Sequence, residues 1–286
     1  MTPKAWGPAP EHRPVGPEQP AEGVGRGGGG GMAGRVPEAV AGAVEESRAA
    51  LRGALAEPLS AWRQDISPKR PGPVVFSSPG GAEGGSWRRF RAELLFSLPA
   101  QDGTEEGSGG EGCAESRFLR DIFENYCLFH RRETWDPSIA TQRELRRWEG
   151  GYSCVAYTTA AAAGGAIGPR LMVDVRVHRS EELPFENCST NSADFDEEAV
   201  HGLGEGGRRH VRAANLPGGG CTLARVKGGD AEGRRFFRFC MLGRTDLGGW
   251  LPAALANSAS AGAYRDILAG GLPIIEAAGG RVEHWR

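Results

Sequence analysis

Residues 245–252 read Thr-Asp-Leu-Gly-Gly-Trp-Leu-Pro and lead into the last helical pattern of the chain, residues 250–268. Trp250 is expected to open and anchor this helix. Apolar side chains recur on one face at helical spacing, namely Leu251, Leu255, Ala259 and Ile267, with Gly262 and Ala263 beside them. Small residues either leave room for a ligand or let a helix pack closely on a sheet, and the pattern alone leaves both readings open.

Strand patterns precede this helix over most of the C-terminal half. The clearest cover residues 152–159 and 171–178, and weaker ones cover 188–192, 210–214, 222–226 and 235–243. No regular alternation of strand and helix occurs. Parallel βαβ units are therefore not expected, and the strands are expected to pair in an antiparallel sheet.

The N-terminal half contains two helical patterns separated by a short β meander. The first begins near Val36 and is broken at Pro58. Three β-like stretches follow at 74–76, 87–91 and 93–98, and then an acidic, glycine-rich insertion at 101–116. A second helical pattern starts at Phe118 and ends near residues 130–132. The order predicts an α+β fold in which helices are segregated from one curved antiparallel sheet.

Composition narrows the class of protein. The 286 residues carry a formal net charge of -2, which does not favour nucleic-acid binding. Six scattered cysteines indicate reduced thiols rather than a disulfide framework. No run of about 18 apolar residues and no secretory signal is present, so we expect a cytoplasmic protein. Residues 1–34, rich in glycine and proline, predict a disordered tail.

Motifs for catalysis or metal binding are not found in the sequence. There is no Gly-x-Ser-x-Gly elbow and no His-Glu-x-x-His helix. The glycines within residues 160–169 are not followed by Lys-Ser/Thr, so they do not form a phosphate-binding loop. We therefore predict no enzyme activity, no catalytic residues, no cofactor and no metal.

Four short segments carry a resemblance to a known family. They are Thr134-Trp135-Asp136-Pro137, residues 165–170 followed by 173–176, residues 210–213, and residues 245–252. In this order and spacing they resemble elements of START (StAR-related lipid transfer) domains, and Asn257 also fits the pattern. The resemblance covers roughly residues 36–275 and leaves 276–286 as a C-terminal tail.

The resemblance implies a helix-grip fold, in which a curved antiparallel sheet wraps around a long C-terminal helix and encloses a cavity. It also implies a lipid ligand, such as a sterol or a phospholipid, and transfer of that lipid between membranes. Residues 160–169 then match the loop that gates the cavity and touches the bilayer. We expect a monomer that contacts a membrane surface transiently and binds no nucleic acid.

The strand at 171–178 supplies the polar candidates for the ligand site. Asp174, Arg176 and His178 alternate with three valines, so the polar side chains share one face. If the valines line the core, the polar face is solvated; the resemblance instead favours Arg176 pointing inward, against a lipid head group. The full predicted lining comprises Arg176, Asp174, His178, Tyr157, Ile167, Leu251, Leu255, Ala259 and Gly262.

Two other functions stay open at this point. One is an enzyme of the cyclase or hydrolase type on the same hollow fold, which an ordered acid–base pair inside the cavity would favour. The other is a ligand-sensing interaction module whose N-terminal tail recruits partners.

Overall fold

The computed structural model describes residues 34–66, 71–78, 88–99, 111–203, 210–229 and 233–284. The predicted tail lies outside this range except for Gly34. No helix in the described part of the chain is both long and apolar enough to span a bilayer.

Most strands belong to one sheet, in the order β1-β2-β3-β11-β10-β7-β6-β5-β4. Neighbours along this path are antiparallel, β13 adds to β3, and the short β8 lies parallel to β6. A separate two-stranded ladder joins β9 and β12. The bounds are β1 Arg63–Ile66, β2 Val74–Ser78, β3 Arg89–Leu98, β4 Ile139–Arg147, β5 Tyr152–Thr159, β6 Arg170–Arg179, β7 Phe185–Asn191, β8 Val211–Arg212, β9 Ala214–Asn215, β10 Gly219–Gly229, β11 Arg235–Gly243, β12 Thr245–Asp246 and β13 Arg281–Val282.

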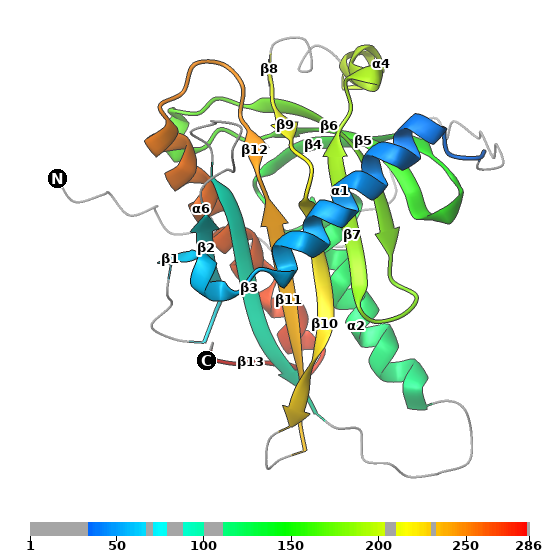
Figure 1. Ribbon diagram of the computed structural model, residues 1–286, viewed down its shortest axis with the longest axis vertical. Helices are drawn as coiled ribbons and strands as arrows, with labels where there is room; N and C mark the ends of the chain where they lie inside the picture. The colour runs from blue at the N-terminus through cyan, green and yellow to red at the C-terminus, as the bar shows by residue number, and fades with distance from the viewer. Residues whose placement is uncertain are drawn as a thin grey trace, which may run out of the picture. The chain divides into compact units, whose positions relative to one another are not determined.

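Helices cover both faces of this sheet (Figure 1). The first helix crosses one face over β6, β7 and β10, which we call the outer face. On the inner face, α6 packs on β2 and β3, and α2 packs on β7 and β10. The helical segments are α1 Glu38–Ala56, α2 Glu111–Cys127, α3 Phe129–Arg132, α4 Asp196–Gly202, α6 Ala253–Gly270 and α7 Leu272–Ala277, with short 3-10 turns at Leu59–Ala61, Glu149–Gly151, Ala163–Gly165 and Ala193–Phe195.

The core has two large parts, one on each face, and a smaller third cluster that contains Phe129, Val155, Tyr157, Met172 and Ala213. Beneath α1, the outer core contains Val44 and Leu51 of the helix and the valines of β6. The inner core contains the aromatic side chains of β3 and β11 together with Phe123 and Tyr126 of α2. Because both faces are covered, the central strands are buried along most of their length.

Several predicted boundaries were wrong. The stretches at 87–91 and 93–98 form the single strand β3, and β4 and α4 were not predicted. The helix α2 begins at Glu111, inside the predicted insertion, where acidic residues are favourable near a helix N-terminus. Residues 101–110 lie outside the described range. The predicted C-terminal tail is partly ordered, because Arg281–Val282 pairs with β3.

The last helix begins three residues later than predicted, at Ala253. Gly248 and Gly249 adopt positive φ angles of 63° and 68°, and Pro252 is extended, so the chain turns before the helix starts. The side chain of Trp250 is 91% exposed, so the prediction that Trp250 anchors the helix was wrong. Ala256, Ala261 and Leu268 form the buried side of α6 instead.

Candidate ligand site on the inner face of the sheet

Strand β6 separates apolar and polar side chains onto two faces, and both faces are buried. Its valines pack beneath α1 in the outer core. Asp174 and Arg176 point the other way and are only 2% and 6% exposed, and His178 is half-buried. The polar face is therefore not solvated. With Tyr157 of β5, these three residues form what we call the interior polar cluster.

Asp174 is the centre of a hydrogen-bond network. Its Oδ2 accepts hydrogen bonds from the Tyr157 hydroxyl at 3.2 Å and from Asn215 Nδ2 at 2.7 Å. Asn215 Nδ2 also donates to Tyr157 at 2.9 Å, and Thr245 Oγ1 donates to Asn215 Oδ1 at 2.9 Å. Asn215 and Thr245 belong to the β9–β12 ladder. The network thus connects the interior of the sheet to the segment that leads into α6.

Burial raises the pKa of the Asp174 carboxyl to about 6. Hydrogen bonds from Asn215 and Tyr157 and the charge of Arg176 act in the opposite direction and keep the pKa from rising further. The second oxygen, Oδ1, is buried and has no hydrogen-bond partner among the described residues. This carboxyl therefore has one acceptor oxygen without a partner among the described residues and a pKa of about 6.

Arg176 carries a buried positive charge close to an aromatic ring. Its Nε donates to Ser153 Oγ at 3.2 Å, and its guanidinium lies 4.8 Å from the ring centroid of Phe129. Burial lowers the pKa of Arg176, although the nearby charge of Asp174 raises it. No described residue accepts a hydrogen bond from the two terminal nitrogens. These nitrogens are the strongest donors that the cluster offers to an anionic or carbonyl-bearing head group.

His178 stacks on Phe123, with ring centroids 5.3 Å apart. Both of its ring nitrogens are buried without a hydrogen bond to a described residue, and so is Oδ1 of its cross-strand neighbour Asn187. Burial lowers the pKa of His178, which favours the neutral imidazole. The neutral ring presents one donor and one acceptor.

The remaining predicted residues lie apart from this cluster. Ile167 is buried at the end of loop 160–169. Leu251, Leu255, Ala259 and Gly262 are half-buried. The sheet-facing side of α6 carries Tyr264, which stacks on Phe90, and the residues at 255, 259 and 262 lie about 140–180° from Tyr264 around the helix. A Cβ at Gly262 would meet no atom within 4 Å.

The structure adds residues that the sequence did not single out. Ser153, Phe129 and Asn215 contact Arg176 or Asp174, yet each comes from a different segment of the chain. Ser153 could have been predicted from the sequence, because it lies on one of the clearest predicted strands and shares a face with Tyr157. The other two positions depend on how α3 and the β9–β12 ladder fold back onto the sheet.

Comparison with solved structures shows the fold. The chain is similar to human StAR-related lipid transfer protein 5, with a TM-score of 0.59 and 18% sequence identity, covering 83% of this chain and 98% of that chain. It is also similar to human STARD10, with a TM-score of 0.55 and 14% identity, covering 87% and 86% of the two chains. This chain has a START-type fold. The predicted helix-grip architecture is thereby confirmed.

The similarity to START proteins is found by comparison of structures and not by comparison of whole sequences. No family model matches the chain, and no curated protein matches its sequence. Identities of 14–18% are too low to transfer individual residues, so the roles of the interior polar cluster rest on its own geometry.

Proposed function

We propose that this chain binds one lipid-like molecule between the inner face of its sheet and α6, and carries it through water as a monomer in the cytoplasm. The observation that carries the proposal is the interior polar cluster. A buried arginine lies beside a buried carboxylate, one oxygen of which has no hydrogen bond from a described residue. Both similar structures are START proteins, and the first is named a lipid transfer protein.

The two parts of the ligand contribute differently to binding: the hydrocarbon part to affinity and the head group to selectivity. Each methylene moved from water into an apolar interior contributes about 0.8 kcal/mol, so the hydrocarbon part supplies most of the affinity. Burying a polar group without a partner is costly, so the interior polar cluster selects for a head group that satisfies Arg176 and Asp174. A sterol hydroxyl, a phospholipid head group or another polar terminus has this character.

The surface around α6 supports a transient membrane contact. Loop 160–169 exposes alanines and glycines and carries no charge. Arg170 ties the base of this loop to the segment before α6 through a 2.6 Å hydrogen bond to the carbonyl oxygen of Leu247. Trp250 and Val211 are 91% and 41% exposed beside that segment. Exposed tryptophan and small uncharged residues enter a bilayer interface at low cost.

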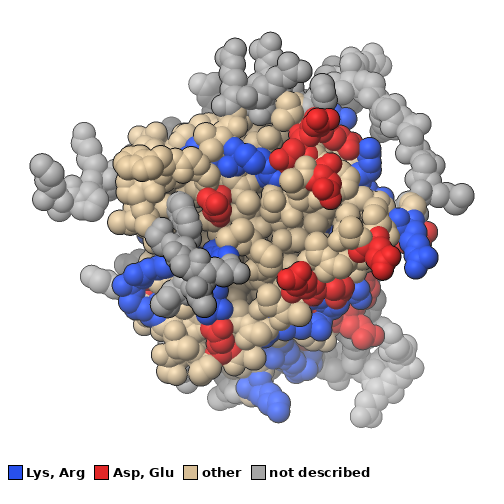
Figure 2. Space-filling model, turned by 45° about the horizontal axis from the view of Figure 1, so that its top comes forward, with Lys and Arg blue, Asp and Glu red and all other residues tan. Residues whose placement is uncertain are grey.

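Figure 2 brings the end of the molecule with β8 and β12 forward. It shows a broad area without Lys, Arg, Asp or Glu side chains, bordered by both acidic and basic residues. We infer that loop 160–169 gates the ligand site when this end meets a membrane.

The test is to purify the chain from cells and identify co-purified lipid by mass spectrometry. We expect one defined lipid class, and Arg176→Leu should lower the affinity for that lipid at least about tenfold, since a hydrogen bond to a charged group contributes about 1.5–3 kcal/mol. Arg179→Leu, an exposed arginine of the same strand, is the matched control. Folded Arg176→Leu protein with unchanged affinity removes Arg176 from the site, and an empty wild-type chain that extracts no lipid from vesicles refutes the proposal.

A second function is favoured by one observation. A carboxyl with a pKa of about 6, hydrogen-bonded to a tyrosine, is the type of group that general acid–base catalysis uses. An enzyme of the cyclase or hydrolase type would turn over a small hydrophobic substrate and lose activity in Asp174→Asn. Stable retention of an unmodified lipid by the purified chain decides against this alternative.

A further inference from the structure

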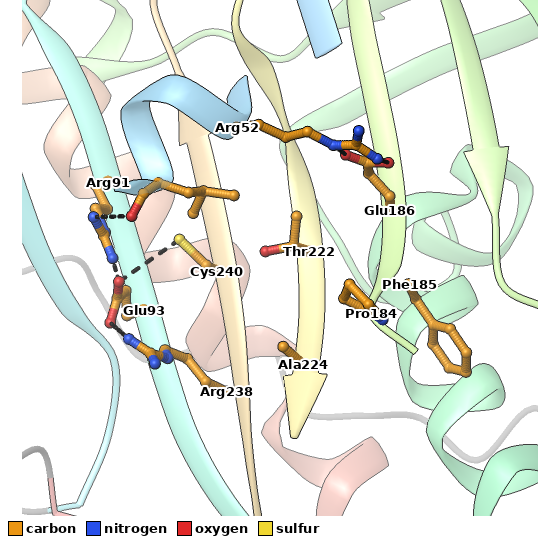
Figure 3. Close-up of a pocket in the computed structure, with 11 residues that line it drawn as sticks. Arg52, Arg91, Glu93, Pro184, Phe185, Glu186, Thr222, Ala224, Arg238 and Cys240 are labelled. Atoms are coloured by element: carbon orange, nitrogen blue, oxygen red, sulfur yellow. Dashed lines mark hydrogen bonds and ion pairs between the residues drawn. The ribbon is translucent and has the colours of Figure 1, made fainter. Parts of the chain in front are cut away.

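A pocket of about 290 Å³ opens on the outer face of the sheet, beside the C-terminal half of α1 (Figure 3). Its lining includes Leu55 of α1 and the cross-strand neighbours Thr222 of β10 and Cys240 of β11. Cys240 alternates with Phe239, which is buried in the inner core, so the pocket lies across the sheet from the interior polar cluster. It is separate from the proposed lipid site.

One carboxylate that lines this pocket is only partly satisfied. Glu93 of β3 is 0% exposed, and its Oε1 accepts a hydrogen bond from Arg91 Nε at 2.5 Å. Its Oε2 is buried and has no hydrogen bond from any described residue. Burying a carboxylate oxygen without a donor is costly, so a molecule in the pocket that donates a hydrogen bond to Oε2 removes that cost.

The other carboxylate of the pocket is already satisfied. Glu186 of β7 accepts hydrogen bonds from Arg52 on both oxygens, each at 3.0 Å. Cys240 and Thr222 lie between Glu93 and Glu186 in cross-strand register, so the two acidic positions are three strand spacings of about 4.8 Å apart. The open polar position is therefore at the Glu93 end alone.

Arg238 of β11 supplies a donor beside Glu93 Oε2. Its Nη1 lies 3.9 Å from that oxygen, which is too long for a hydrogen bond, and its side chain is 39% exposed. A hydroxyl oxygen within about 2.9 Å of both atoms fits this separation, because a hydroxyl donates one hydrogen bond and accepts others. Glu93 and Arg238 thus offer an acceptor and a donor to the same hydroxyl group.

The charges around this position favour an uncharged ligand. An anion would lie against the Glu93 carboxylate, and a cation would lie against the guanidinium groups of Arg91 and Arg238. One water molecule also bridges such a pair, but it takes up only about 30 Å³ and leaves most of the pocket to a larger molecule. Leu55 and Ala224 provide apolar contact for the carbon atoms of that molecule.

We propose that the Glu93 end of the outer pocket binds an uncharged polyol of the size of a monosaccharide. One hydroxyl of the polyol donates to Glu93 Oε2 and accepts from Arg238 Nη1. A second hydroxyl meets Thr222, whose side-chain oxygen makes no hydrogen bond with a described residue and is directed toward Cys240 in Figure 3. Occupancy of this site does not depend on the interior lipid site.

The test is titration of the full chain with D-glucose, followed by ligand-detected NMR. Arg238→Met keeps the aliphatic stem and removes the donors, and Arg225→Met is the matched control. Arg225 is an exposed arginine of β10 on the face opposite to Thr222. We expect wild type and Arg225→Met to bind D-glucose equally, and Arg238→Met to bind it about tenfold more weakly, because a hydrogen bond to a charged group is lost.

A second variant keeps the test decisive. Thr222→Val should weaken D-glucose binding about threefold, since it removes a hydrogen bond between neutral groups, and it replaces Arg238→Met where that variant unfolds. Absence of binding to wild type, or equal affinities of wild type and the variant used, overturns the proposal and leaves water as the occupant of the pocket. The lipid that co-purifies with Arg238→Met should equal that of wild type, which separates this result from a failure of the lipid-binding proposal.

Discussion

Burial of the charged Asp174 carboxylate destabilises the folded state. Its carboxyl has a pKa of about 6 in the folded protein, against 3.8 for an unperturbed carboxyl. Well below pH 3.8 it is protonated in both states, and between pH 3.8 and 6 only the unfolded state releases the proton. As the pH rises through 6 the folded state must bury a charge, so stability is lost in this window. The loss amounts to about 3 kcal/mol when complete.

Asp174→Asn should therefore stabilise the chain above pH 6 by up to about 3 kcal/mol and leave its stability at pH 4 nearly unchanged. Urea unfolding of both proteins between pH 4 and pH 8 measures this difference. Asp194→Asn, at an exposed aspartate, is the control and should shift the free energy of unfolding by less than about 0.5 kcal/mol. A difference that shrinks as the pH rises would contradict the assignment.

The sequence predicted that Asp174, Arg176 and His178 share a face, but it left open whether that face is exposed to solvent. Period-two alternation settles which side chains lie together and says nothing about what covers them. The answer depends on α1 covering the valines and on α2, α3 and the β9–β12 ladder covering the polar face. These contacts join segments that are distant in the chain, so a local sequence pattern does not predict them.

At the scale of elements, the turn before α6 depends on one glycine. Gly248 has a φ of 63°, and a Cβ at this position would collide with the carbonyl oxygen of Arg212. Gly248→Ala is therefore expected to lower the free energy of unfolding by about 1–3 kcal/mol. Denaturant unfolding measures it.

Gly42→Ala is expected to change the free energy of unfolding in the opposite direction. Gly42 is exposed within α1, and a Cβ there would meet no atom within 4 Å. Alanine favours a helix over glycine by about 0.5–1 kcal/mol, so this variant should be more stable than wild type. If both substitutions change stability in the same direction, the role assigned to the turn at Gly248 fails.

The predictions of strands were wrong where charged residues interrupt the apolar pattern. Strand β4 was not predicted because its segment, residues 139–147, is dominated by polar and charged side chains, with Leu145 its one buried residue. It lies at the sheet edge, where charged residues discourage further strand pairing. In β3 the buried pair Arg91–Glu93 split one strand into two predicted ones. Strands β5 and β11 matched their predicted bounds.

The molecule combines a sheet covered on both faces with an area at one end that carries no Lys, Arg, Asp or Glu side chains. Recognition of the START fold came from the order of four short segments, and structural similarity confirms it at 14–18% identity. The exposure of Trp250 was not predicted, because its place before a helix suggested an anchor. With Gly248 and Gly249 turning the chain, the ring instead extends into solvent beside Val211.

Trp250 should therefore act when the whole molecule meets a membrane. Its side chain contributes little to the folded state because it is 91% exposed, so Trp250→Ser should change the free energy of unfolding by less than about 0.5 kcal/mol. It should lower binding to phosphatidylcholine vesicles about tenfold, since burying an indole at a bilayer interface contributes more than 1 kcal/mol. Phe118→Ser, at another exposed aromatic residue on α2, is the control and should bind vesicles as wild type does. Equal vesicle binding by wild type and Trp250→Ser would assign membrane contact to a different face.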